Sequence, residues 1–205
     1  MSCKIIGFEN GPLEVDCANV VFIKEGKKIE AENPSHPCRC GHSKNKPWCD
    51  GSHTKAGFRS QREITEEIIQ VYNGKEITVN FNRSICAGAV ACVHGLPNVF
   101  TSDSSTDWIV PDNESSEKII ETIKACPSGA LSYTVNNKVM VDKRVEPKIT
   151  IMKNGPYCVE GIALDGMPTP TNFSTTKYTL CRCGYSKNRP YCDYSHAEEG
   201  WSDEG

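Results

Sequence analysis

The chain has 205 residues, 12 of them cysteine, and a formal net charge of −3. This weakly acidic balance gives no electrostatic footprint for nucleic acid, and no apolar run approaches the ~20 residues that a membrane-spanning helix needs. The N-terminal segment has no basic region followed by an apolar core, so a secretory signal is not expected. We therefore expect a cytoplasmic protein without nucleic-acid or membrane partners, whose clustered Cys and His residues bind metal rather than form a disulfide framework.

Two copies of one cysteine-rich segment organise the chain. The first, CRCGHSKNKPWCDGSH, covers residues 38–53, and the second, CRCGYSKNRPYCDYSH, covers residues 181–196. They are identical at twelve of sixteen positions, including the whole pattern Cys-x-Cys-x8-Cys-x3-His. Short β-like runs separated by turn signals precede each copy, and a Gly-aromatic pair follows it. The repeat therefore covers residues 4–60 and 147–202, and each unit is predicted to be a small antiparallel β layer that carries a metal loop.

The residues between the two copies follow a different pattern. Their predicted elements, in chain order, are a strand at 76–81, a short helix at 90–96, a strand at 108–110, a helix at 114–125 and a hairpin at 132–141. Together they form a compact module of a size that folds as an autonomous domain. We predict an α+β fold with three domains, at residues 1–60, 61–146 and 147–205.

Each copy supplies three thiolates and one imidazole, a complete set of four ligands. Zinc takes such a set in structural sites, usually from Cys-x2-4-Cys knuckles. A [2Fe–2S] cluster also needs four ligands, two for each iron; the Cys-x-Cys pair could hold one iron and leave Cys49 and His53 for the other. Spacing alone leaves zinc and the cluster about equally supported.

The first copy, with Ser43, Pro47 and the run from Cys49 to His53, resembles the signature of the CDGSH iron–sulfur proteins, the mitoNEET family. The resemblance implies a [2Fe–2S] cluster in each copy and two β-rich units, each a β-cap with a cluster-binding loop, packed as an intramolecular pseudo-dimer. We expect a monomer that lacks the N-terminal membrane anchor of mitoNEET. Tyr194 stands where the family has Gly, which can serve a special backbone angle. The implied ligands are Cys38, Cys40, Cys49 and His53 in the first copy, and Cys181, Cys183, Cys192 and His196 in the second.

The middle module resembles the divergent mono-cluster ferredoxin domains, through Cys86, Cys92 and the Cys126-Pro127 pair. Bacterial ferredoxins have the pattern Cys-x2-Cys-x2-Cys with a distant Cys-Pro, and Ala89 occupies the second Cys position here. The resemblance implies a [3Fe–4S] cluster held by the three cysteines, or a [4Fe–4S] cluster with a non-cysteine ligand, for which His94 is a candidate. The alternative is a ferredoxin-like domain that has lost its cluster.

The other chemistry-bearing residues receive structural predictions. Asp50 and Asp193 are expected to cap a short helix or orient the loops. Basic side chains around the loops are either solvated or form a docking rim for an acidic redox partner: Arg39, Lys44, Lys46, Arg182, Lys187 and Arg189. The remaining cysteines are expected to be buried and free: Cys3, Cys17 and Cys158.

The sequence carries no catalytic triad, phosphate-binding loop, catalytic carboxylate pair or dinucleotide fingerprint, so we predict no enzyme activity. We expect an electron carrier with three clusters that works with a redox partner protein. The alternatives are storage of clusters or their donation to an apo-protein, sensing of redox state or iron, and a structural zinc protein.

Overall fold

The computed structural model describes residues 3–101 and 107–204, so the first two residues of the N-terminal segment lie outside it. The short β-like runs of both terminal segments form strands, and two further strands at residues 4–7 and 148–151 precede them. The first segment contains β1 (Lys4–Gly7), β2 (Leu13–Asp16), β3 (Val21–Lys24), β4 (Lys27–Ile29) and helix α1 (Ser52–Lys55). The last contains β9 (Lys148–Ile151), β10 (Tyr157–Glu160), β11 (Ala163–Asp165), β12 (Lys177–Leu180) and helix α4 (Ser195–Glu198).

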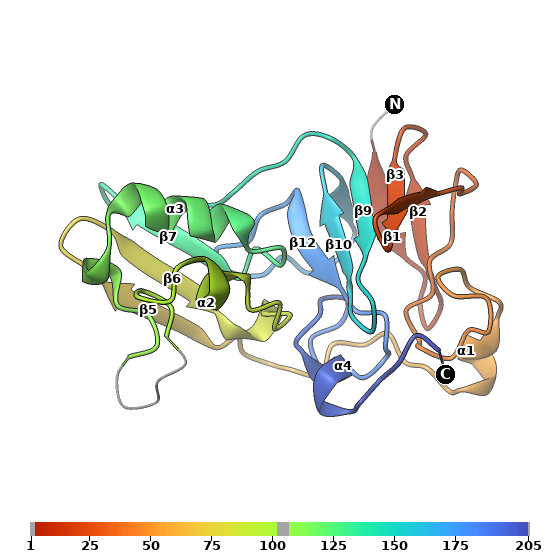
Figure 1. The fold of residues 1–205 in the computed structure, drawn as a ribbon. Helices are drawn as coiled ribbons and strands as arrows, with labels where there is room; N and C mark the ends of the chain where they lie inside the picture. The colour runs from red at the N-terminus through yellow and green to blue at the C-terminus, as the bar shows by residue number, and fades with distance from the viewer. Residues whose placement is uncertain (1–2, 102–106, 205) are drawn as a thin grey trace.

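The two terminal segments exchange strands. β1 pairs with β2 in antiparallel fashion and, on its other edge, in parallel with β11 from the far end of the chain. In the same way β3 of the first segment pairs in parallel with β9 of the last. The sheets therefore run β11-β1-β2 and β12-β10-β9-β3-β4, and the strands lie together on one side of the molecule (Figure 1). Neither terminal segment can complete its sheet without the other.

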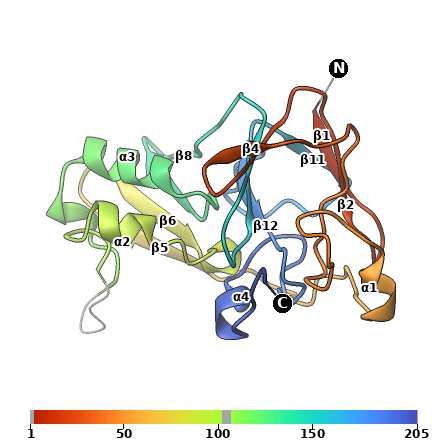
Figure 2. The same cartoon turned by 45° about the vertical axis from the view of Figure 1, so that its right-hand side comes forward.

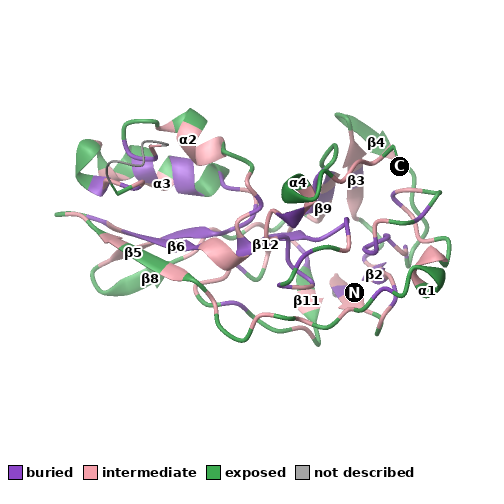
Figure 3. Cartoon of the chain, turned by 90° about the horizontal axis from the view of Figure 1, so that it is seen from below, coloured by how far each residue is buried: buried purple, intermediate pink, exposed green. Residues whose placement is uncertain are grey.

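Residues 61–146 form a separate sheet, covered on one face. Helices α2 and α3 lie on the same side of this sheet (Figure 3). Ile119 and Ile123 of α3 and Val79 of β6 are fully buried between the two layers. The antiparallel sheet runs β5-β6-β7-β8, and the elements are β5 (Ile69–Asn73), β6 (Thr78–Asn82), η1 (Arg83–Ile85), α2 (Ala91–Gly95), η2 (Pro111–Asn113), α3 (Ser116–Ala125), β7 (Leu131–Val135) and β8 (Lys138–Met140).

The strand predicted at residues 108–110 is wrong. Only a single bridge joins Ile109 to Phe100, and Pro111 starts the 3-10 turn η2 directly afterwards. The apolar residues of this run cover the sheet instead of extending it, because Ile109 is buried and the Trp108 ring packs edge-on against Phe81 at 4.6 Å. A run of three residues before a proline is too short to show whether it extends the sheet or covers it.

The middle module packs on the last segment of the chain. All four residues of β12 are buried, although β12 is an edge strand. Lys177 of β12 donates to the carbonyl of Lys124 at the end of α3 (3.0 Å) and forms an ion pair with Asp142 (2.9 Å). Helix α4 lies on the side of the terminal segments nearer the module, whereas α1 lies on the far side (Figure 1 and Figure 2).

The three unassigned cysteines differ from the expectation of free buried thiols. Cys3 and Cys17 form a disulfide that ties the start of β1 to the end of β2. Local sequence did not show this pairing, because the antiparallel register of β1 and β2 brings the two residues together. Cys158 is free, as expected, but only half-buried. No helix among the residues that the structure describes has both the length and the apolar character needed to cross a membrane.

Candidate cluster-binding sites

The first loop (residues 38–53) and the second loop (residues 181–196) share one internal framework. The Ser43 hydroxyl donates to the Trp48 carbonyl (2.6 Å). The Asp50 carboxylate accepts the backbone N–H groups of Lys44 (2.9 Å) and Ser52 (3.0 Å), which lowers the pKa of this carboxyl. Asp50 thus orients the loop, one of its two predicted roles. The second loop has the same bonds, from Ser186 Oγ to Tyr191 O (2.7 Å) and from the N–H groups of Lys187 (2.8 Å) and Ser195 (3.1 Å) to Asp193.

The four donors of each loop lie as two close pairs. In the first loop the Sγ atoms of Cys38 and Cys40 are 3.6 Å apart, and Cys49 Sγ is 3.4 Å from His53 Nδ1. Two donors on one tetrahedral metal, with bonds of about 2.3 Å to sulfur and about 2.0 Å to nitrogen, are separated by about 3.5–3.8 Å. Each pair is therefore spaced to hold one metal ion. The second loop repeats the spacing, with 3.5 Å between Cys181 and Cys183 and 3.4 Å between Cys192 and His196.

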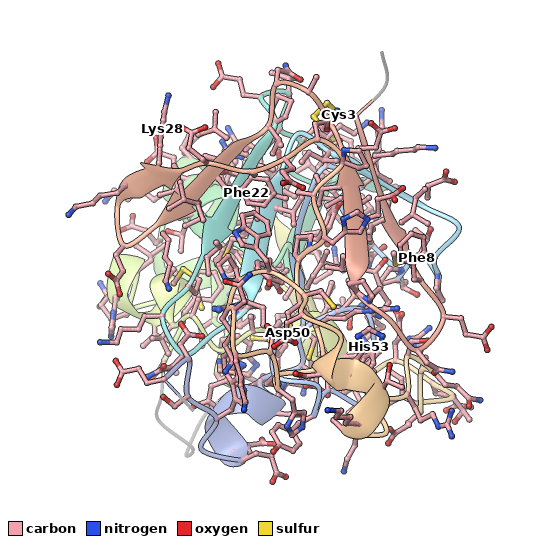
Figure 4. The ribbon with its side chains drawn as sticks, turned by 90° about the vertical axis from the view of Figure 1, so that its right-hand side faces the viewer. Cys3, Phe8, Phe22, Lys28, Asp50 and His53 are labelled. Carbon is pink, nitrogen blue, oxygen red and sulfur yellow. A yellow bond between two sulfur atoms is a disulfide. The ribbon has the colours of Figure 1, made fainter. Side chains whose placement is uncertain are left out.

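Among the described residues, no three Cys, His, Asp or Glu side chains converge closely enough to surround a single ion. Each loop instead offers two pairs of donors, one pair for each metal. This set of donors fits a binuclear cluster. Figure 4 shows His53 and Asp50 side by side on the first loop, at the opposite end of the unit from Cys3.

The local environment favours thiolate at one cysteine of each Cys-x-Cys pair. A hydrogen bond from Cys40, aided by backbone N–H groups, lowers the pKa of Cys38 to about 5. The equivalent hydrogen bond from Cys183 lowers the pKa of Cys181 to about 7. Burial raises the pKa of Cys192 well above its usual value. A metal must displace the remaining protons, since thiolate is the ligating form.

The two loops pack back to back at their Cys-x-Cys-Gly segments. Gly41 and Gly184 both have left-handed backbones, with φ of 81° and 82°. A Cβ on Gly41 would lie 2.3 Å from the carbonyl oxygen of Cys183, and one on Gly184 would lie 2.5 Å from that of Cys40. Tyr157, from β10, adds a hydrogen bond from its hydroxyl to the Cys38 carbonyl (2.8 Å). The two loops thus pack directly on each other.

Two of the predicted rim residues are structural instead. Arg39 and Arg182 are buried, with exposed fractions of 6% and 3%. Arg39 donates to the Gly11 carbonyl (2.8 Å); burial lowers its pKa to about 10, an effect that the charge of Cys181 opposes. Arg182 binds the Asp203 carboxylate through Nη2 (2.8 Å). Sequence spacing could not predict the burial of these two arginines, because the groups that accept their hydrogen bonds lie on turns distant in the chain. Lys44 and Lys187 are exposed, as a rim would require, and Lys46 and Arg189 are half-buried.

The middle module gathers its three cysteines from three elements. Cys86 follows η1, Cys92 lies on α2 and Cys126 ends α3. Burial raises the pKa of Cys86 and of Cys92, the latter to about 11, and the charge of Cys126 adds to both shifts. Cys86 and Cys92 line a cavity of about 500 Å³. Helices α2 and α3 pack together, so the three thiols lie on neighbouring elements, as a ferredoxin-type cluster requires of its thiolate ligands.

His94 does not join this group. It is exposed on α2, and the cavity beside Cys86 and Cys92 is lined by its neighbour Val93 rather than by His94. The half-buried thiol of Cys158 lies nearer the site, because it lines one cavity together with Cys126. Burial raises the pKa of this thiol to about 12, and the charge of Cys126 adds to the shift. Sequence reasoning missed Cys158, since it stands on β10, far along the chain from the other three cysteines.

The matches to known protein families fall on the same three segments. Residues 10–54 and 154–197 match the family described as "Iron-binding zinc finger CDGSH type", and residues 72–136 match "Divergent 4Fe-4S mono-cluster". The chain is 39% identical over 62 residues to "Uncharacterized protein YjdI" of Escherichia coli strain K12 and, equally, of strain O157:H7. This match covers 30% of the chain and 80% of YjdI. No solved structure matches the chain.

These matches and the donor geometry agree that the protein is an iron–sulfur protein. The chain belongs to the CDGSH iron–sulfur family, in a form that carries two CDGSH segments with a divergent 4Fe-4S mono-cluster segment between them.

Proposed function

We propose that the protein is an electron carrier that holds two [2Fe–2S] clusters, each on three Cys and one His, and one ferredoxin-type cluster. The observation that carries the proposal is the pairing of donors in each loop, at 3.6 and 3.4 Å in the first and 3.5 and 3.4 Å in the second. A binuclear cluster uses two donors for each iron, whereas a structural zinc site draws four donors around one ion. The [2Fe–2S] cluster would supply one-electron chemistry, and the protein would position and insulate it.

The architecture proposed with this function is an internal pseudo-dimer. The reciprocal pairings of β3 with β9 and of β1 with β11 support it, as does the packing of Gly41 against Cys183 and of Gly184 against Cys40. Residues 61–146 are the proposed ferredoxin-like insert. The boundaries at residues 60 and 146 stay predictions, as do the monomeric state, the cytoplasmic location and the lack of enzyme activity. The Cys3–Cys17 disulfide argues against the cytoplasmic location, because such bonds are rare in reducing compartments.

The cluster types are tested by metal and sulfide analysis together with EPR. We expect iron with acid-labile sulfide, [2Fe–2S] signals after reduction with dithionite, and, for a [3Fe–4S] centre, a further signal in the oxidised protein. A [4Fe–4S] centre would instead give its signal after reduction. Zinc without sulfide would overturn the proposal.

Single ligand substitutions test the two-donor arrangement. Cys49→Ser and Cys192→Ser should each remove both irons of one [2Fe–2S] site and leave the other sites loaded, since each cluster needs both of its pairs. The control is Cys3→Ser, which removes a cysteine outside every donor set. Loss of a single metal ion without sulfide in either ligand variant would contradict a binuclear site.

Cluster donation is the second candidate, favoured at the first loop. Cys49 and His53 are only half-buried. Cys49 also borders a cavity of about 520 Å³ that Glu30, Glu32 and Trp48 help to line. The test is incubation with an apo-ferredoxin: transfer of [2Fe–2S] absorbance to the acceptor supports donation, whereas clusters that are reduced rapidly and stay bound support electron transfer.

A further inference from the structure

The two loops carry identical donors in unequal surroundings. Cys49 is half-buried, whereas Cys192, its counterpart, is 2% exposed. The middle module packs on the second loop. Asn188 Nδ2 donates to the carbonyl of Ser84 (2.7 Å), and Arg83 Nη1 donates to that of Asp193 (3.3 Å).

Tyr194 is the residue of the second loop that meets the module. Its backbone has φ 83°, and that of Gly51, its counterpart, has φ 85°. Both loops therefore keep the left-handed conformation that glycine adopts readily and a tyrosine rarely does. In the second loop this conformation is held by a tyrosine, for which it is unfavourable. The retained tyrosine points to a use for its side chain.

The ring of Tyr194 lies between two donor sets. A Cβ on Gly88 would lie 2.0 Å from Tyr194 Cδ2, so the ring rests directly on the backbone of the turn between Cys86 and Cys92. Together with these two cysteines, Tyr194 lines the cavity of about 500 Å³. On its other side the ring meets the imidazole of His196 edge-on, with centroids 5.6 Å apart.

A second contact joins the same two sites. His196 and Cys158 line a cavity of about 150 Å³ together with Gly88 and Ala89 of the module. Cys158 also lines a cavity with Cys126 of the module, so this thiol lies between the two donor sets. The first loop has a different neighbour, the open cavity beside Cys49.

We propose that the middle centre and the second CDGSH centre form an internal redox pair, with Tyr194 as the contact between them, while the first centre is the one open to partners. The inference rests on the proposed clusters. Cys86, Cys92 and Cys126 would hold the centre that gives up one electron when reduced, and Cys181, Cys183, Cys192 and His196 would hold the oxidised [2Fe–2S] centre that accepts it. The tyrosine keeps its hydroxyl proton and its oxidation state, and a reductant such as dithionite supplies the electron.

The pairing is tested by EPR on the loaded protein, because a paramagnetic centre broadens the signal of a close neighbour. In Cys49→Ser protein the remaining [2Fe–2S] signal belongs to the second loop and should be broadened by the reduced middle cluster. In Cys192→Ser protein the signal belongs to the first loop and should be narrow. Equal widths in the two proteins would overturn the inference.

Tyr194→Gly tests the contact itself. The first loop carries glycine at this position and the backbone already has a glycine-like φ, so the variant should fold. In stopped-flow reduction of wild-type protein, the second and middle centres should be reduced in one phase. In Tyr194→Gly they should separate into two phases, with loss of the broadening. Tyr185→His also restores a first-loop residue, but at a 43% exposed side chain, and should change neither result.

Gly88→Ala approaches the contact from the module. The new methyl group would displace the Tyr194 ring and should mimic Tyr194→Gly, and adding it to Tyr194→Gly should have no further effect on the phases. Gly95→Ala is the control, since its Cβ would only touch Thr122 Cγ2 at 3.7 Å. Unchanged phases in both Tyr194→Gly and Gly88→Ala would refute the role of the ring.

Thiol labelling of apo-protein separates failure of this inference from failure of the proposed function. With iodoacetamide, Cys49 should be alkylated faster than Cys192, and Tyr194→Gly should remove most of that difference. A preparation without iron and sulfide would refute the proposed function. A loaded protein whose Cys192 is alkylated as fast as Cys49 in the apo form, with equal EPR widths, would refute only the pairing.

Discussion

Replacing Gly41 with alanine is expected to lower the free energy of unfolding by about 3 kcal/mol or more. Two costs add at this position. The left-handed backbone, with φ 81°, disfavours any side chain, and the new Cβ would meet the Cys183 carbonyl oxygen at 2.3 Å. That oxygen belongs to the backbone of the opposite loop, so it cannot rotate away. Gly184→Ala should have a similar effect, because its Cβ would lie 2.5 Å from the Cys40 oxygen.

The matched control is Gly51→Ala. Gly51 has φ 85°, but its Cβ would have no atom within 4 Å. It therefore carries the backbone cost alone, about 1 kcal/mol. The measurement is urea unfolding followed by circular dichroism, with the visible absorbance of the clusters as a second probe. Equal losses of stability in Gly41→Ala and Gly51→Ala would show that the two loops do not pack at Gly41.

Replacing Arg182 with alanine is expected to cost about 3–5 kcal/mol, the range for breaking a buried ion pair by removing one partner. The guanidinium donates to the carbonyls of Met152 (2.7 Å) and Gly155 (3.1 Å) and pairs with Asp203 at 2.8 Å. The Arg182 and Asp203 side chains are 2% and 10% exposed, so the carboxylate would remain desolvated without its partner. The cluster on the neighbouring Cys181 should also be lost more readily.

Arg182→Lys should recover only part of this loss, because an ammonium group cannot reproduce the planar fork that reaches two carbonyls and a carboxylate. Arg39→Ala is the comparison within the chain, expected to cost less because the contacts of Arg39 with Gly11 and Phe8 are to neutral carbonyls. The exposed Lys187→Ala should stay within about 0.5 kcal/mol of wild type. Thermal unfolding monitored by circular dichroism measures all four. Near-equal stability of Arg182→Ala and Lys187→Ala would contradict the buried role of Arg182.

Local sequence pattern was sufficient for much of the fold and of the candidate sites. The ligand spacing of the two loops predicted a metal site in each, because metal donors must lie close together along a short loop, and the resemblance of the longer motif indicated the family. The helix at residues 116–125 and the hairpin of β7 and β8 followed from periodicity and from the Asn136-Asn137 turn. Strands β1, β5, β9 and β11 were missed, since short runs beside turns carry little pattern.

The sequence by itself determined the two CDGSH loops, the three-cysteine pattern of the middle module and the alternation of most strands, because each depends on residues close together in the chain. Tertiary structure alone decided the exchange of strands, the Cys3–Cys17 disulfide, the burial of Arg39 and Arg182, and the contact of Tyr194 with Gly88. The two loops look equivalent in sequence, but the described residues of the module between them pack on the second loop. The two loops differ in burial because burial depends on neighbours that are distant in the chain, and local spacing does not indicate which residues these are.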